Sequence, residues 1–315
     1  MDPLSIATVA PPHPLMCHAR RAVAHDRLRL YDSCNQRIPG GIDAIGSVRG
    51  RRGNSAARTR MRRGRPAVTL VIIIALLFAT SFISGLFGVA GGLILMGGLV
   101  HLLPVSQAMI VHGLAQFVSN FTRVVLWRRY IAWRTIWGFL AGALVAVLIF
   151  SLIQFVPSKI VVLFVLGAST LTVQLMPKGW APKVTQRGVP FACGVAATSL
   201  QLTAGVSGTF INQFFLGAAL DRRTIIATLA VIQSVLHLLK VAYFGLIAGG
   251  IDETLFPTLA VVPIVAILTG LLAGRVLERM TDRQYEWWVS RIVLTVGLYY
   301  VAESARLAFL ALAEG

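Results

Sequence analysis

Two long apolar stretches of the chain carry polar side chains at the same helical spacing. They are Ser106–Trp127 and Arg223–Ala248. Each holds three polar residues that lie four and then three positions apart, and this spacing places them on one face of a helix. The two sets are Gln116, Asn120 and Arg123, and Gln233, His237 and Lys240. Every member of the second set follows its counterpart by 117 positions, which indicates an internal repeat.

Both stretches are long enough to cross a bilayer as helices. A charged side chain in the middle of a membrane costs at least about 2.5–3.5 kcal/mol, so Arg123 and Lys240 require a compensating interaction. We interpret the two polar faces as the lining of a polar path through the membrane. The alternative is hydrogen bonding between neighbouring helices without a path. Arg123 has a further alternative, because it lies near Trp127 and can extend toward the membrane interface.

A glycine-rich break repeats at the same offset. The apolar runs 69–87 and 189–204 are each interrupted, and each break precedes a short apolar run, 93–103 or 210–220. Short, glycine-interrupted segments at matching places in two halves are typical of transporter binding sites, because unwound backbone frees N–H groups for an anion. The break residues that we assign to the site are Gly88, Gly91, Gly92, Gly205, Ser207, Gly208 and Thr209. Close helix packing on glycine is the alternative.

Two further apolar spans follow the polar stretch in each half. They lie at 135–156, 160–176, 254–274 and 292–312. The sequence therefore predicts an all-α, polytopic helical membrane protein with two homologous repeats, 66–178 and 179–315, each of about five segments. Because an odd number of crossings turns the second copy upside down, we expect the repeats to be inverted. The positive-inside rule then makes the side of Arg128, Arg129, Arg222 and Arg223 cytoplasmic.

Residues 1–65 form a basic tail with thirteen arginines and no helical or strand periodicity, so we expect this tail to be disordered. A second interpretation is that translation starts at Met61, which opens a basic stub followed directly by an apolar run. A third is a cleaved signal peptide. The first apolar run is needed to complete the repeat, which argues against cleavage.

Composition agrees with a membrane protein, since 56% of the residues are hydrophobic and the mean hydropathy is +0.76. The net charge of +17 comes largely from the tail and the ends of apolar runs. It therefore does not indicate a nucleic-acid partner, which would require a basic surface on a folded module. The three cysteines, Cys17, Cys34 and Cys193, have no metal-site spacing. We assign no disulfide, metal or cofactor.

No enzyme motif accompanies these segments. The chain has no G-x-S-x-G, H-E-x-x-H or phosphate-binding G-x-x-x-x-G-K-[ST] sequence, so we expect no enzyme activity and no ATP hydrolysis by this chain. Transport would then be secondary, driven by a proton, another ion or the substrate gradient. Glu303 and Arg306 are three residues apart in the last span, and we expect them to pair with each other.

Four segments of the chain resemble those of one known family. They are the breaks GVAGG (88–92) and GVSGT (205–209) and the stretches HGLAQFVSNFTRVVLWRRYI (112–131) and ATLAVIQSVLHLLKVAYFG (227–245). This family is the TauE/SafE sulfite exporter family, also called the 4-toluene sulfonate uptake permeases, and the resemblance covers about residues 68–312. It implies two repeats with glycine-rich breaks. It also implies export or uptake of sulfite or organosulfonates across the cytoplasmic (inner) membrane of a bacterium.

We therefore expect a multi-pass secondary transporter of small anions, with the breaks and the two polar faces as its site. Arg123 and Lys240 would attract the anion, while Gln116, Asn120, Gln233 and His237 would replace part of its hydration shell. The expected partners are the anion, the lipid bilayer and a coupling ion that the sequence leaves open, as it does the direction of transport and the oligomeric state. The rival functions are a passive anion channel and a membrane scaffold without flux.

Overall fold

The computed structural model describes residues 70–84, 89–177, 180–216, 218–277 and 281–314. All of them belong to the unit of the chain that spans residues 57–315. Within these described ranges the regular structure is helical, and the prediction of an all-α protein is confirmed. The basic tail 1–65, Met61 and Gly88 lie outside the described residues.

The helices of the first half follow the predicted apolar runs. They are Leu70–Ser84, α3 (Val89–Leu102), α4 (Val105–Trp127), α5 (Trp133–Ile153) and α6 (Lys159–Leu175). One boundary differs from the prediction, because α3 already begins at Val89 and includes Gly91 and Gly92. The physical reason is a close approach: a Cβ on Gly91 would meet backbone atoms of Thr80 and Ser84. Glycine at this position allows the first turn of α3 to pack directly against the backbone of the preceding helix.

The second half has a break at the predicted place, but the break is shorter than predicted, because the helix after it already begins at Gly208 and includes Thr209. Its helices are α7 (Val189–Ala204), α8 (Gly208–Phe215), α9 (Arg222–Ala242), α10 (Phe256–Leu277) and α11 (Asp282–Ala313). Gly205 caps α7 with a φ of 80°, a left-handed conformation that glycine adopts without steric cost. Ser207 is the N-cap of α8, and α9 continues into a π-helical turn at Tyr243–Ile247.

Five helices of the described chain are long and apolar enough to cross a membrane. They are Val105–Tyr130, Trp133–Ile153, Arg222–Ile247, Glu253–Ala273 and Trp287–Ala313. The outward faces are apolar as well: on α5, Leu144, Leu148 and Leu152 are exposed and lie four residues apart. Water would disfavour such an apolar stripe, whereas lipid accommodates it. The chain is a multi-pass membrane protein.

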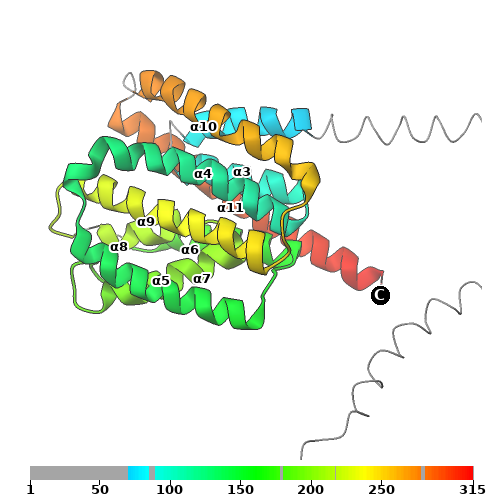
Figure 1. Cartoon of the computed structure of the whole chain (residues 1–315), viewed down its shortest axis with the longest axis horizontal. Helices are drawn as coiled ribbons and strands as arrows, with labels where there is room; N and C mark the ends of the chain where they lie inside the picture. The colour runs from blue at the N-terminus through cyan, green and yellow to red at the C-terminus, as the bar shows by residue number, and fades with distance from the viewer. Residues whose placement is uncertain (1–69, 85–88, 178–179, 217, 278–280, 315) are drawn as a thin grey trace, which may run out of the picture. The chain divides into compact units, whose positions relative to one another are not determined.

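The two helices with the polar faces, α4 and α9, pack against each other along their length and run in opposite directions (Figure 1). At one end Lys240 of α9 bonds to His112 of α4. Near the other end Thr228 of α9 accepts a hydrogen bond from the backbone N–H of Ala132, just beyond α4. Figure 1 also shows α10 beside α4 and α5 beside α9, so the polar pair lies inside the bundle.

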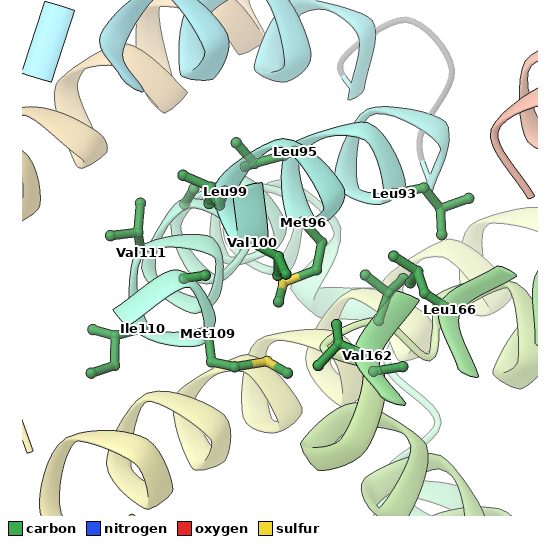
Figure 2. Packing of buried hydrophobic residues seen from close by; sticks show 14 of the residues in the cluster. Leu93, Leu95, Met96, Leu99, Val100, Met109, Ile110, Val111, Val162 and Leu166 are labelled. Atoms are coloured by element: carbon green, nitrogen blue, oxygen red, sulfur yellow. The ribbon is translucent and has the colours of Figure 1, made fainter. Parts of the chain in front are cut away.

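The apolar core surrounds the short helix α3. Figure 2 shows Met96 and Val100 of α3, Met109 of α4 and Val162 of α6 gathered in the space between these three helices. All four are 2% exposed or less. Methionine side chains fill irregular gaps because they are unbranched and flexible. The core thus fixes α3 and α4 relative to each other and positions the polar face of α4.

Small residues bring α5 and α7 together. A Cβ on Gly142 of α5 would meet the carbonyl oxygen of Phe191, and a Cβ on Gly194 of α7 would meet that of Phe139. Such close crossings are common in membranes, where packing replaces the hydrophobic effect between helices. The short helices also have matching neighbours, since α3 contacts α4 and α11 while α8 contacts α9 and α6. The repeat and its inversion stay predictions.

Candidate site: a polar cavity between the two central helices

A cavity of about 420 Å³ lies beside the packed pair α4 and α9. Further walls come from Leu70–Ser84, α3, α6, α8 and α11 and from Val206 of the second break. Its polar lining is Ser84, His112, Gln116, Asn120, Arg123, Gln174, Thr209, Asn212, Gln213, Gln233 and His237. Polar side chains from both halves of the chain therefore meet at one place.

Most of the predicted site residues line this cavity. They are Gly92, Gln116, Asn120, Arg123, Gly208, Thr209, Gln233 and His237. Four others do not line it: Gly91, Gly205, Ser207 and Lys240. Gly88 lies outside the described residues. The two polar faces thus converge, but the last member of the second set, Lys240, is placed elsewhere.

The described side chains that line the cavity are neutral or positively charged. Among the described lining residues Arg123 is the only arginine or lysine, and none is an aspartate or glutamate. Within the described chain the amides of Gln116 and Gln233 have no hydrogen-bond partner. The amide of Asn120 already donates to the carbonyl oxygen of Gln116, at 2.9 Å. The described lining of the cavity therefore offers hydrogen-bond donors and a guanidinium group, and it contains no carboxylate.

Lys240 is fully buried, with 0% exposure. Its Nζ lies 2.7 Å from Nδ1 of His112 and 2.8 Å from the carbonyl oxygen of Gly205. The left-handed turn at Gly205 ends α7 and frees its carbonyl from the helical hydrogen-bond ladder. His112, which does line the cavity, places its Nε2 3.0 Å from the carbonyl oxygen of Gly92. One chain of hydrogen bonds thus connects α3 with the second break.

A second polar chain fixes His237. Its Nδ1 lies 2.9 Å from Nε2 of Gln201, and Ser207 donates to Oε1 of the same glutamine at 2.8 Å. Gln201 and Ser207 are buried, on α7 and at the start of α8. The ring of His237 lies 5.5 Å from that of His112, centroid to centroid. Ser207, in the second break, therefore helps to position His237 at the cavity through Gln201.

Sequence reasoning missed several lining residues. Thr209, Asn212 and Gln213 lie on one face of α8 at helical spacing, so the last two had a signal that sequence reasoning could have used. His112 extends the first polar face by one turn but has no polar counterpart at Leu229. Gln174, which lines the cavity, and Gln201, which contacts His237, are isolated polar residues in apolar helices. Only the packing of α6 and α7 shows what these two residues face.

The prediction of a pair near the end of the chain is confirmed. Arg306 donates to Glu303 through Nε and Nη2, both at 2.7 Å. His101 of α3 lies 3.4 Å from the same carboxylate. None of these three residues lines the cavity.

The fold and the cavity define a class: a polytopic helical membrane protein with a polar cavity inside its bundle, as expected of a permease. The chain belongs to the sulfite exporter TauE/SafE family, whose model matches residues 72–300. The match covers most of the chain and includes both breaks and both polar faces. Comparisons with curated proteins and with solved structures gave no match.

Proposed function

We propose that this protein is a secondary transporter that moves small sulfur-containing anions, sulfite or organosulfonates, across the cytoplasmic membrane. The observation that carries the proposal is the cavity between α4 and α9, whose described lining contains Arg123 and several side-chain amides and no carboxylate. Membership in a transporter family supports the same conclusion. The expected absence of enzyme activity belongs to this proposal.

An anion gains more from Arg123 in such a cavity than in water. Charge–charge attraction strengthens as the effective dielectric constant falls, and guanidinium groups match oxyanions geometrically. The unpartnered amides of Gln116 and Gln233 can donate to further oxygens of the anion. These groups would replace the hydration shell that the anion loses on entry.

The remaining walls suit a sulfonate with an organic group. Ile226, Leu229, Val289 and Val293 line the same cavity. Apolar side chains favour a hydrocarbon substituent by about 25 cal/mol per Å² of buried surface. One cavity thus combines a place for an oxyanion head with a place for an apolar tail. Gly208 and Thr209 also bring the first turn of α8 to the cavity, where backbone N–H groups favour anions.

The test is anion flux into proteoliposomes that contain the purified full chain. The panel is sulfite, sulfate, thiosulfate, an alkanesulfonate and chloride, each with and without an imposed pH gradient. We expect flux of sulfur oxyanions or sulfonates and little flux of chloride. Flux that depends only on the electrochemical gradient of the anion, with ohmic conductance, indicates a passive channel. The absence of flux for every anion contradicts the proposal.

Arg123→Gln sharpens this test. Losing a charge-assisted contact worth about 1.5–3 kcal/mol should weaken the apparent affinity for the anion by about tenfold or more. Arg129→Gln is the matched control, since Arg129 is exposed after α4 and lies outside the cavity lining. Equal affinities of the two variants would remove Arg123 from the site.

A further inference from the structure

The proposed function leaves Lys240 without a role. Its ammonium is fully buried, does not line the cavity and, in the described chain, contacts no carboxylate. Both of its partners are hydrogen-bond acceptors with no net charge, a backbone carbonyl and an imidazole nitrogen. A buried cation without a counter-ion is expensive in a membrane and marks a functional site.

The geometry determines the state of His112. The carbonyl oxygen of Gly92 can only accept, so Nε2 of His112 must carry a proton to make the 3.0 Å contact. In a neutral ring Nδ1 is then an acceptor, and it faces Nζ of Lys240 at 2.7 Å. Lys240 therefore donates to Nδ1 when the lysine is charged.

The pair can hold one extra proton but not two. If Lys240 were an ammonium and His112 an imidazolium, two positively charged groups would each point an N–H at the other across 2.7 Å, which is repulsive. With one charge, two arrangements satisfy the same contacts: Nζ donates to Nδ1, or a proton has moved to Nδ1 and the neutral amine accepts from it. In the second arrangement Nζ still donates to Gly205, and the total charge remains +1.

The surroundings isolate this proton. Lys240 contacts the carbonyl of Gly205 at the end of α7, and His112 contacts the carbonyl of Gly92 in α3. The other titratable groups near it are His237, whose Nδ1 accepts from Gln201, and Arg123 of the cavity. Glu303 of α11 is paired with Arg306 and His101. Within the described chain the pair contacts no carboxylate, so an anion in the cavity can supply the negative charge that its proton requires.

We propose that Lys240 and His112 form a single-proton site behind the cavity, and that its positive charge favours an anion in front of it. The inference rests on the proposed function, because it names the coupling ion of the same site. His112 borders the cavity but is 0% exposed, so exchange of its proton with water there requires a local opening of the packing. Anion and proton then bind together, and the bonds to Gly92 and Gly205 make the packing of α3 and α7 sensitive to the charge.

Thermodynamic linkage between proton binding and anion binding determines how the anion affinity changes with pH. As pH rises the pair loses its proton and its charge, so anion affinity falls, by up to about tenfold per pH unit for one coupled proton. An alkanesulfonate is the right probe, since its own charge does not change in the working range. Its affinity for the purified full chain is measured by calorimetry between about pH 5 and pH 9.

Two variants separate the charge from its titration. Lys240→Arg keeps a positive charge that cannot be lost in this range, so affinity should stay high and flat with pH. Lys240→Met has no charge, so affinity should be low and flat. Lys183→Met, in an exposed loop, is the matched control and should keep the wild-type slope.

The outcomes are distinct. A falling wild-type affinity with flat profiles in both Lys240 variants supports the proposal, and should Lys240→Met not accumulate, the flat profile of Lys240→Arg carries the same conclusion. A flat wild-type profile overturns the proton site but leaves anion transport standing. A wild-type slope that survives in Lys240→Arg also overturns it and assigns the titration to a histidine of the cavity, His112 or His237. If no anion binds or crosses at any pH, the proposed function itself fails.

Discussion

The polar faces of α4 and α9 meet along one line, the polar seam, whose two ends differ. Arg123 lies toward one end and Lys240 toward the other. At the Arg123 end, side chains line a cavity of about 420 Å³, and the amides of Gln116 and Gln233 have no partner among the described residues. At the Lys240 end, the hydrogen-bonding groups are matched to one another, and Lys240, Gln201 and His112 are 0% exposed. The spacing of polar residues is the same in both helices, yet one end borders a cavity and the other is closely packed.

The difference comes from what packs over each end. The left-handed Gly205 directs a carbonyl toward Lys240, and α7 adds Gln201 beside His237. Among the described residues no comparable group covers Gln116 and Gln233, where α6, α8 and α11 border the cavity. A polar face on a helix therefore shows where partners are required, whereas neighbouring helices decide whether those partners are protein groups or a ligand.

The largest expected effect comes from reversing the charge at each end. In Lys240→Glu a carboxylate would face the carbonyl of Gly205 and the acceptor Nδ1 of His112, and an unpaired buried charge costs several kcal/mol. We expect this variant not to accumulate in membranes. Arg123→Glu should accumulate, because its side chain borders the cavity, but should not transport anions. Membrane abundance and flux measure the two; normal abundance of Lys240→Glu would contradict the comparison.

An intermediate effect is expected from adding one methyl group at either glycine break. Gly205→Ala forces alanine into a φ of 80° and places Cβ 2.7 Å from Sδ of Met96, so we expect a loss of about 1–3 kcal/mol in stability. Gly92→Ala places Cβ 3.4 Å from the Gln116 amide, an ordinary contact. This variant should keep its thermal stability and transport bulky sulfonates more slowly than sulfite. Equal melting temperatures for the two variants would count against the assigned roles.

Much of the helical framework was predictable from sequence, because apolar runs of membrane length leave few alternatives. The second break was predictable too, since Gly205 provides a backbone conformation that other residues rarely adopt. The first break was predicted too long: Gly91 serves a close approach to Thr80 and Ser84 within a helix. Sequence alone does not distinguish a glycine that unwinds a helix from one that lets two backbones meet.

The candidate site was predictable in part. The spacing of Gln116, Asn120 and Arg123 identified the lining of α4. The separation of Lys240 from the cavity was not predictable, because it depends on the antiparallel contact with His112 and on the direction of the Gly205 carbonyl. Long-range contacts of this kind arise only from tertiary packing.

The smallest expected effect lies outside the seam, at the start of α9. The carboxylate of Asp221 accepts hydrogen bonds from the side chain and backbone of Thr224 and from the backbone of Arg223, which lowers its pKa. This cap contributes fully above the ordinary pKa of an aspartate and is lost as pH falls through the lowered value. Asp221→Asn should therefore slightly reduce thermal stability at neutral pH and reduce its dependence on acid. An unchanged acid dependence would contradict the role of this cap.

The most direct measurement compares ligand access at the two ends of the seam. Cys17, Cys34 and Cys193 are first replaced by alanine, and then Asn120→Cys or Ser207→Cys provides a single thiol, the first in the cavity lining and the second in the buried network. We predict that a small thiol reagent modifies Asn120→Cys, that a saturating alkanesulfonate protects it, and that Ser207→Cys reacts far more slowly. Modification of both thiols at one rate, or no protection at Asn120→Cys, would contradict an anion cavity beside a closed lysine–histidine site.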